Sequence, residues 1–286
     1  MKKAICIVAS VASSVSVLKS TPPSVARPRL AYSLFQRTVT LVVFLSLFLS
    51  LPATASQTFQ SGPEQSVLIE LYTSEGCASC PPADEWMTDL TKSPYLWKTF
   101  VPVAYHIDYW DYLGWKDKLS QKYFSERQRA YASQNKSGSV YTPMIVNNGS
   151  ELKEWYLTPT IKVKSKKDAG MLKVDVVSPE ELKITYLPHN GAYMEGLVVY
   201  VAKLGFDYKS QIEGGENKGQ MINHNFAVLS LAQQDLQYKN GMLSATARFE
   251  KELPVTIPKQ GVAVWVSKKD SYEPIQATGG YLESAA

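Results

Sequence analysis

Cysteine is scarce in this chain of 286 residues, which contains three: Cys6, Cys77 and Cys80. A scaffold held together by disulfides needs several cysteine pairs, so this fold must be stabilised by the packing of apolar side chains. Because 45% of the residues are hydrophobic, the chain can bury one large core or two modest ones. The two neighbouring cysteines, Cys77 and Cys80, are therefore available for function.

Acidic side chains are absent from residues 1–55, which end in an apolar run over residues 41–51 and the triplet Ala53-Thr54-Ala55. A basic region, an apolar segment of about a dozen residues and a small-x-small site are typical of a secretory signal, so we expect cleavage after Ala55. An uncleaved membrane anchor is disfavoured because the run is shorter than the ~20 residues that cross a bilayer. The predicted mature protein is therefore exported, either to the periplasm or outside the cell.

The length of this leader leaves its origin open. A bacterial signal whose start codon is assigned too early is one interpretation, and a bipartite organelle presequence that directs export into a lumen is the other. Six of the 30 basic side chains lie in this leader, so 24 remain against 26 acidic ones in the mature part. Since no basic stripe remains, we expect no nucleic-acid partner, and we expect no stable membrane insertion after cleavage.

The mature chain changes character near residue 155, where alternating strand-like and helical patterns give way to short strands and turns. This predicts an α/β domain over residues 56–155 and a mainly β, sandwich-like domain over residues 156–286. The elements expected in the first domain are strand 67–73, helix 82–91, strand 100–107, helix 117–134 and a hairpin at 144–149. Those expected in the second are strands 172–177, 182–187, 197–206, 242–249 and 261–266, with one helix at 226–234.

The segment Cys77-Ala78-Ser79-Cys80 directly follows the apolar run 67–72 and precedes Pro81-Pro82. A C-x-x-C pair between a strand and a helix is typical of a redox dithiol. Two sulfurs on a first helical turn can close a small disulfide ring, and the helix N-terminus stabilises the sulfur that is left as thiolate. A structural disulfide in a surface turn is the alternative.

Residues 67–80 resemble the strand, loop and active-site helix of the thioredoxin superfamily, and Tyr141-Thr142-Pro143 resembles that fold's cis-proline loop. More closely, the chain is similar to a family of exported thioredoxin-like proteins known as a domain of unknown function. The similarity covers nearly all of the mature chain and is carried by residues 77–84, 105–111, 114–117, 127–131, 141–143 and 215–219. It implies a thioredoxin-like fold without an established reaction.

The resemblance also implies roles for single residues. Cys77 would be the exposed nucleophile, and Cys80 would resolve the mixed disulfide. Glu70 lies near the position of a buried acid that accepts a proton from the resolving cysteine, although its spacing differs by one residue; the alternative is a carboxylate that faces solvent at a strand edge. A cis Thr142-Pro143 bond would expose backbone groups to an extended substrate.

Five aromatic side chains lie within residues 105–115, together with His106 and two aspartates. One interpretation is a peptide-binding groove in which Trp110 and Tyr141 contact substrate and His106 tunes a cysteine. The favoured interpretation for most of the aromatics is an apolar plug at the end of the sheet, with His106 as a core histidine.

The glycine-rich loop 212–219 is the unusual feature of the second half. Its Glu216 and Asn217, with His224 nearby, are candidates for contact with a ligand or with the first domain. The favoured interpretation is a simple turn before the helix expected at 226–234.

Together these features predict an exported thiol–disulfide oxidoreductase that needs no cofactor and acts on protein thiols, disulfides or a redox partner protein. A copper carrier that binds metal through Cys77, Cys80 and His106 is the second hypothesis, because two thiolates and one imidazole suit copper. A non-catalytic binding protein with a thioredoxin fold is the third.

Overall fold

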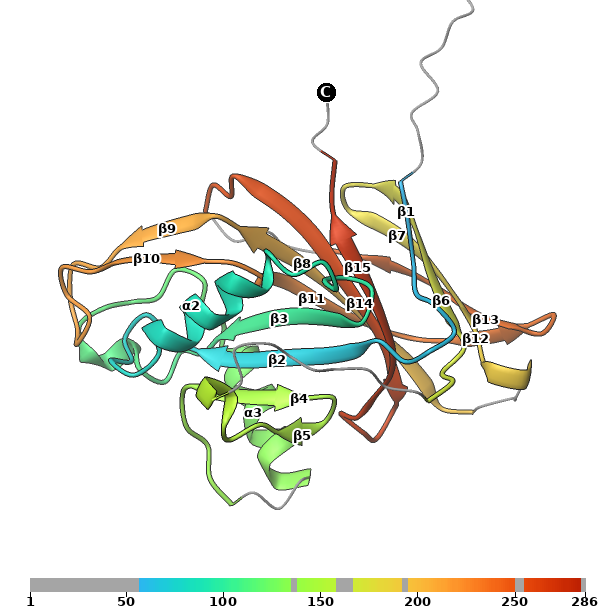
Figure 1. Ribbon diagram of the computed structural model, residues 1–286, viewed down its shortest axis with the longest axis horizontal. Coiled ribbons are helices and arrows are strands. Elements are labelled where there is room, and N and C mark those ends of the chain that lie inside the picture. The colour runs from blue at the N-terminus through green and yellow to red at the C-terminus, as the bar shows by residue number, and fades with distance from the viewer. Residues whose placement is uncertain (1–56, 135–137, 158–166, 192–194, 250–254, 284–286) are drawn as a thin grey trace, which may run out of the picture. The chain divides into compact units, whose positions relative to one another are not determined.

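The computed structural model describes residues 57–134, 138–157, 167–191, 195–249 and 255–283 (Figure 1). The presequence expected over residues 1–55 lies outside these ranges. Residues Ala55–Ala286 belong to one compact unit. Within the described ranges, neither the length nor the apolar character of any helix is sufficient to span a membrane.

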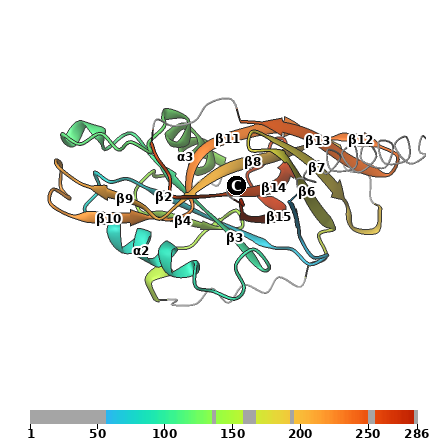
Figure 2. The same cartoon turned by 90° about the horizontal axis from the view of Figure 1, so that it is seen from above.

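An eight-stranded mixed sheet is the largest element of the fold, and its order is β15-β14-β8-β11-β3-β2-β4-β5 (Figures 1 and 2). Strand β3 runs parallel to both of its neighbours, and the other pairs are antiparallel. The strands are β2 (Val67–Thr73), β3 (Phe100–His106), β4 (Met144–Asn147), β5 (Ser150–Glu151), β8 (Leu197–Phe206), β11 (Ala227–Asp235), β14 (Lys259–Lys268) and β15 (Pro274–Tyr281).

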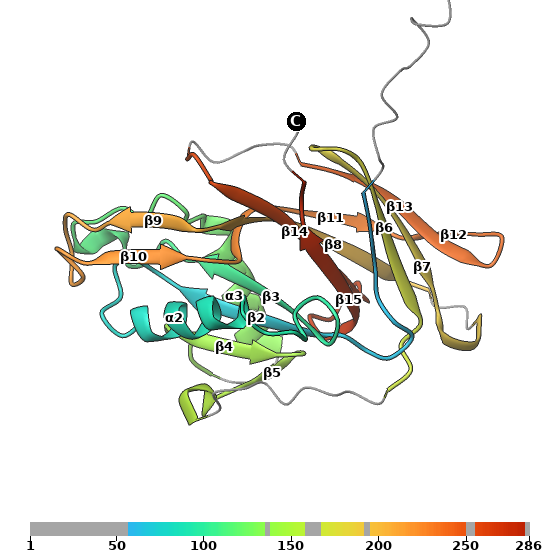
Figure 3. The ribbon, with the colours of Figure 1, turned by 45° about the horizontal axis from the view of Figure 1, so that its top comes forward.

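A five-stranded antiparallel sheet of order β1-β6-β7-β13-β12 and a two-stranded ribbon complete the strands (Figure 3). The five strands are β1 (Thr58–Gln60), β6 (Met171–Ser178), β7 (Glu181–Leu187), β12 (Gln237–Lys239) and β13 (Met242–Arg248). The ribbon consists of β9 (Tyr208–Gln211) and β10 (Met221–His224), and β10 contacts helix α2. The helical segments are α2 (Pro81–Leu90), α3 (Lys122–Gln134), and the short 3-10 turns η1 (Asp111–Leu113), η2 (Trp155–Leu157) and η3 (His189–Gly191).

Strand β8 is buried on both faces because it lies between two hydrophobic cores. Side chains alternate across a strand. Tyr200, Ala202 and Leu204 accordingly join the core beneath β2 and β3. Val199 and Val201 point the other way, into the core shared with β6, β7 and β13. The unbroken apolar run of β8 thus reflects a strand covered by a layer on each side.

This architecture corrects the expected fold class. An α/β thioredoxin-like domain followed by a separate β-domain is wrong, because the described chain is mainly β with two α-helices and the second half completes the sheet of the first. Strand β11 pairs with β3 through Ala227 and Ala104. Burial on both faces requires β8 and β14 to lie inside the molecule, and the large sheet provides that position.

The helix expected at residues 226–234 is also wrong, since this segment is strand β11. Eight residue pairs join β11 to β8 in antiparallel register, and pairing along a long apolar neighbour outweighs the local preference. Helix α3 begins at Lys122, not at residue 117, because the carboxylate of Asp117 accepts the backbone N–H of Leu119 and bonds His106.

Several predicted elements are confirmed. Strands 67–73 and 197–206 coincide with β2 and β8. The hairpin at 144–149 turns through Asn148 and Gly149, whose φ angles are 47° and 85°. Such positive φ values suit asparagine and glycine in a tight turn.

Candidate functional site

Cys77 and Cys80 form a disulfide between the end of β2 and the start of α2, with their Cα atoms 5.4 Å apart. The carbonyl oxygen of Cys80 accepts the backbone N–H groups of Ala83 and Asp84 at 2.8 and 3.1 Å. Proline at the first helical positions loses no hydrogen bond, because those N–H groups have no partner inside a helix. The predicted place of the pair, between a strand and a helix, is confirmed.

The disulfide lies just below the molecular surface. Cys77 is 2% exposed and Cys80 is fully buried, whereas Ala78 and Ser79 between them are exposed. The expectation that Cys77 is an exposed sulfur is therefore wrong for the oxidised protein. The sulfur of Cys77 lies 3.3 Å from the hydroxyl of Ser79, an exposed residue.

One side of the disulfide is formed by the predicted cis-proline loop. The Thr142–Pro143 peptide bond is cis, and the Thr142 carbonyl oxygen lies 3.8 Å from the Cys77 sulfur. The indole N–H of Trp110 donates to the Thr142 hydroxyl at 2.7 Å. Tyr141 lies farther out, with its ring exposed and its hydroxyl bonded to Glu151. The structure thus brings Trp110, Thr142 and Pro143 to the disulfide.

The other side is covered by residues 212–219, which we call the covering loop; it connects β9 to β10. The side-chain amide of Asn217 donates to the carbonyl oxygens of Glu75 and Cys77, both at 2.9 Å. The backbone N–H of Ala78 donates to the carboxylate of Glu216 at 3.2 Å. The favoured interpretation of this segment as a simple turn is therefore wrong, because it contacts the C-x-x-C segment directly.

Glycine is required where the covering loop approaches the chain near Gly114. A Cβ atom on Gly214 would lie 2.4 Å from the Gly114 carbonyl oxygen, far inside van der Waals contact. The glycines of this loop thus permit a close approach of two backbones.

Glu70 lies on the opposite side of the sheet from α2. Its carboxylate accepts hydrogen bonds from Arg127 of α3, at 2.8 Å from Nη2 and 3.3 Å from Nε, and both side chains are buried. Thr73, three positions along the same strand, contacts Asp84 of α2 instead. Because side chains alternate along a strand, Glu70 points away from Cys80. Glu70 thus belongs to a buried ion pair. This position fits neither of its two predicted roles, a proton acceptor for Cys80 or a carboxylate that faces solvent.

The aromatic segment 105–115 divides into two parts. Tyr105 is buried in the core, as expected for a plug. Trp110 contacts Thr142, and Trp115 donates its indole N–H to the carboxylate of Glu75 at 2.6 Å. Tyr112 is 76% exposed and stacks on Trp110. Trp110 and Trp115 of the second part therefore border the disulfide site, whereas Tyr112 lies outside it.

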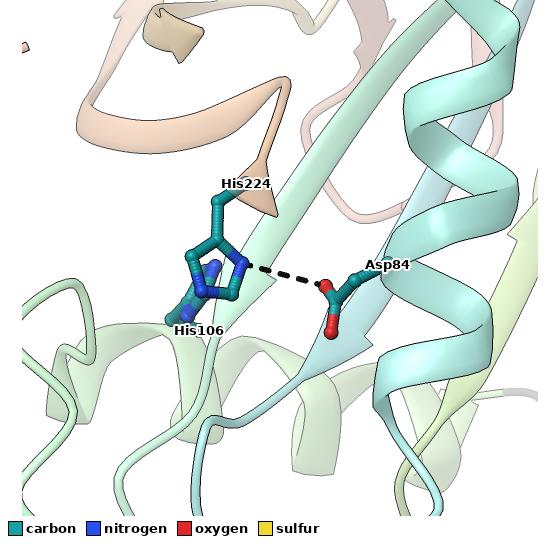
Figure 4. Close-up of side chains that lie close together, drawn as sticks. All are labelled: Asp84, His106 and His224. Carbon is teal, nitrogen blue, oxygen red and sulfur yellow. Dashed lines mark ion pairs between the residues drawn. The ribbon is translucent and has the colours of Figure 1, made fainter. Parts of the chain in front are cut away.

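Next to the disulfide lies a cluster of five buried titratable side chains, which we call the histidine–carboxylate cluster: Glu75, Asp84, His106, Asp117 and His224. Figure 4 shows three of them, from α2, β3 and β10. The two imidazole rings meet edge to face with centroids 4.6 Å apart. Glu75 precedes Cys77 by two residues and Asp84 follows Cys80 by one helical turn, so the cluster adjoins the C-x-x-C segment.

Each imidazole of the cluster is held by a carboxylate. His106 Nδ1 lies 2.7 Å from an Asp117 oxygen, and His224 Nε2 lies 3.1 Å from a Glu75 oxygen. His224 Nδ1 faces Asp84 at 3.7 Å. The carboxylates have further donors: Asp117 accepts the backbone N–H of Glu75, and Asp84 accepts the Thr73 hydroxyl. These contacts place charged or polar partners around every carboxylate, as buried charges require.

These surroundings shift two pKa values. Burial disfavours the charged form of His224, but the neighbouring carboxylates of Asp84 and Glu75 outweigh it and raise the pKa of His224 to about 10. Burial likewise acts to raise the pKa of Asp117, but the adjacent His106 outweighs it and holds that pKa below its usual value.

Sequence reasoning identified His106 and His224 as open candidates, and it missed Glu75, Asp84 and Asp117 as site residues. Residue 84 is predicted only as part of the helix expected at 82–91, and residue 117 only as the start of the helix expected at 117–134. The groups that approach His106 as potential metal ligands are Asp84 and His224, with ligand atoms within 4.8 Å of one another. None of the contacts described for His106 involves Cys77 or Cys80.

The solved structures that resemble this chain include the following two. An X-ray crystal structure of protein AGR_C_4864 from Agrobacterium tumefaciens has a TM-score of 0.54 and 22% identity, and the match covers 79% of this chain and 98% of that one. HBP35 of Porphyromonas gingivalis has a TM-score of 0.57 and 14% identity, with 79% and 77% covered. At these identities the likeness concerns the fold alone.

Among curated proteins, no sequence matches this chain. A family model does match it, over residues 68–267, which include the disulfide, the covering loop and the histidine–carboxylate cluster. Because the match spans well over half of the chain, this protein belongs to the family described as "Protein of unknown function (DUF1223)".

Proposed function

We propose that this protein is an exported thiol–disulfide exchange protein whose Cys77–Cys80 pair cycles between disulfide and dithiol. One observation carries the proposal: the disulfide closes a four-residue segment at the start of α2, with exposed Ala78 and Ser79 above it and the Thr142 carbonyl oxygen 3.8 Å from the Cys77 sulfur. A disulfide that only stapled a surface turn would need no such ordered wall, in which Trp110 holds Thr142 beside one of the sulfurs. The segment instead has the features of a substrate-facing pair.

The exchange proceeds through Cys77. A substrate thiolate attacks the Cys77 sulfur, the Cys77–Cys80 bond breaks, and Cys80 leaves as a thiolate that takes up a proton. A second substrate thiolate then attacks the substrate sulfur of this mixed disulfide, and Cys77 leaves as a thiolate. The substrate has then lost two electrons and gained a disulfide, and the protein pair has been reduced to the dithiol.

Cys77 is assigned as the exchanging sulfur because it keeps 2% exposure while Cys80 has none, and because its sulfur lies beside the Ser79 hydroxyl and the Thr142 carbonyl oxygen. After reduction, the Ser79 hydroxyl at 3.3 Å is placed to donate a hydrogen bond to the Cys77 thiolate. Trp110 holds Thr142, whose carbonyl oxygen lies at the rim beside both Cys77 and Ser79. An extended peptide that contains cysteine is the substrate class that this rim suits.

Two further inferences belong to this proposal. Export, inferred from the presequence over residues 1–55, places the pair in a compartment where disulfides persist. The partners are protein thiols, protein disulfides or a dedicated redox partner that restores the pair. The copper carrier with Cys77, Cys80 and His106 stays a prediction without a supporting contact.

The test is a redox titration of the full chain carrying Cys6→Ser, so that Cys77 and Cys80 are the only thiols that the alkylating reagent detects. The protein is equilibrated across a glutathione series and trapped with a mass-tagged alkylating reagent. We expect both thiols to become reactive together and reversibly within the range of known exchange proteins, about −270 to −120 mV. A pair that stays oxidised at poises below about −300 mV would show a structural disulfide and overturn the proposal.

A further inference from the structure

We propose that Asp84, His106 and His224 form a binding site for a divalent transition-metal ion, with Zn²⁺ as the ion that their donor atoms suit best. This inference is independent of the redox proposal, because it uses none of the cysteine sulfurs. It rests on the geometry of the histidine–carboxylate cluster, in which one carboxylate and two imidazole rings converge from three elements of the fold (Figure 4).

Two ring nitrogens inside the cluster are left without a hydrogen-bond partner. His106 Nε2 and His224 Nδ1 have none among the residues that the structure describes, although His106 is fully buried and His224 is 2% exposed. A buried polar atom without a partner is destabilising and calls for an explanation. One ring nitrogen of each histidine and one Asp84 oxygen lie within 4.8 Å of one another. Because Asp117 and Glu75 engage the other two nitrogens, His106 Nε2 and His224 Nδ1 are the ones available to an ion. A cation between these two nitrogens and the Asp84 oxygen would satisfy all three atoms.

In each ring, the nitrogen that would not bind the ion is held by a carboxylate, as it is in known metal sites. His106 bonds Asp117 through Nδ1, and His224 bonds Glu75 through Nε2. A histidine that binds a metal nearly always donates its other ring N–H to a carboxylate, a carbonyl or water, which fixes the tautomer and turns the free lone pair to the metal. Here both rings have a carboxylate in that role, and Trp115 in turn donates to Glu75.

Distances in the cluster are close to those a bound ion would require. Ligand atoms ~2.0–2.1 Å from a tetrahedral Zn²⁺ are separated by ~3.4 Å. His224 Nδ1 and Asp84 Oδ1 are 3.7 Å apart, and the full set lies within 4.8 Å. Small rotations of the side chains therefore bring the donors to coordination distance without moving the backbone.

Charge and donor type select the class of ion. Three of the five cluster members, Glu75, Asp84 and Asp117, are buried carboxylates, and imidazoles that bind a metal are neutral and do not offset their charge. A divalent cation does. Two imidazole nitrogens with one carboxylate oxygen suit zinc and neighbouring transition metals, whereas Mg²⁺ and Ca²⁺ prefer oxygen ligands alone. Three protein ligands leave a fourth position for water or another small ligand.

The competing arrangement is a metal-free network in which His224 bridges Glu75 and Asp84. To separate the two, the full chain carrying Cys6→Ser is stripped with a chelator while its disulfide is kept oxidised, and Co²⁺ and then Zn²⁺ are titrated. We expect one equivalent to bind, with Co²⁺ absorption bands of a four-coordinate site. Asp84→Asn and His106→Gln should each weaken binding 10-fold or more. The chain has three histidines, so His189→Gln, which removes the exposed one, is the matched control and should change nothing.

A measurement on the unmodified side chains keeps the test decisive if a variant fails to fold. In ¹⁵N-resolved NMR spectra of the Cys6→Ser protein, Zn²⁺ should shift the imidazole signals of His106 and His224 and leave those of His189 in place. The variant with Cys77→Ser and Cys80→Ser should retain the ion. Three outcomes would each overturn the site. They are no binding of Zn²⁺ by the protein with its cluster intact, a shift confined to the His189 signals, and loss of the ion from the double cysteine variant.

Discussion

Asn217 holds the backbone of Cys77: its side-chain nitrogen donates to the Cys77 carbonyl oxygen at 2.9 Å, across 140 positions of the chain. The same nitrogen bonds the Glu75 carbonyl oxygen at 2.9 Å. A single buried amide thus ties the covering loop to the segment that carries the disulfide. We therefore expect access to the sulfurs to depend on a loop that belongs to the second half of the chain.

Replacing Asn217 should therefore expose the disulfide. In Asn217→Ala both hydrogen bonds are lost, so the covering loop opens more often and reduction by dithiothreitol speeds up by about 10-fold, equivalent to ~1.4 kcal/mol of local opening. The rate is measured by quenched alkylation and mass spectrometry. Lys218→Ala, at an exposed position of the same loop, is the matched control. Equal rates in Asn217→Ala and wild type would show that the loop does not limit access.

The two cysteines should differ when each is left alone. Cys80→Ser leaves Cys77 beside the exposed Ala78 and Ser79, and it should form a stable mixed disulfide with oxidised glutathione. Cys77→Ser leaves Cys80, which is fully buried, and its reaction should be slower by about 10-fold or more because the thiolate is less accessible. Intact-mass analysis over time, on chains that also carry Cys6→Ser, measures both. Faster reaction of Cys80 would reverse the assigned roles.

Trp110 should affect exchange with peptides more than it affects stability. Trp110→Phe removes the indole N–H that bonds the Thr142 hydroxyl, so the rim beside Cys77 loses one hydrogen bond worth ~0.5–1.5 kcal/mol. We expect kcat/KM for a disulfide peptide to fall by about 2- to 10-fold. Tyr112→Phe, in the 76% exposed neighbour, should leave the rate unchanged. An equal effect of both variants would argue against a role of Trp110 in positioning the rim.

The Glu70–Arg127 ion pair should stabilise the fold and should have no part in the exchange chemistry of Cys77 and Cys80. Arg127→Met strands a buried carboxylate, so the free energy of unfolding should fall by ~3–5 kcal/mol in urea denaturation. Arg129→Met, at an exposed position of the same helix, should cost less than about 0.5 kcal/mol.

Glu70→Gln gives the complementary test, because Glu70 faces α3 and not Cys80. The rate at which Cys80 is released and alkylated during reduction should stay within about 2-fold of wild type, since a loss of general acid–base catalysis would cost ~100-fold or more. A loss of that size would restore Glu70 as a proton acceptor.

Local sequence was sufficient for the elements whose signals are short-range. The C-x-x-C pair between a strand and a helix start, the Asn148-Gly149 turn and the apolar runs of β2 and β8 were all predictable. In each case the deciding physics acts within a few residues: proline at a helix start, positive φ at a turn, and continuous burial of a strand.

What the sequence by itself determined is the position of the dithiol pair and the chemistry of two sulfurs three residues apart. Only the tertiary structure decided that the two halves share one sheet, that Glu70 belongs to Arg127, and that His106 meets His224 and Asp84. The physical reason is that these contacts join residues tens to more than a hundred positions apart. Their partners are selected by burial and strand register across the whole molecule, and local propensity carries no information about them.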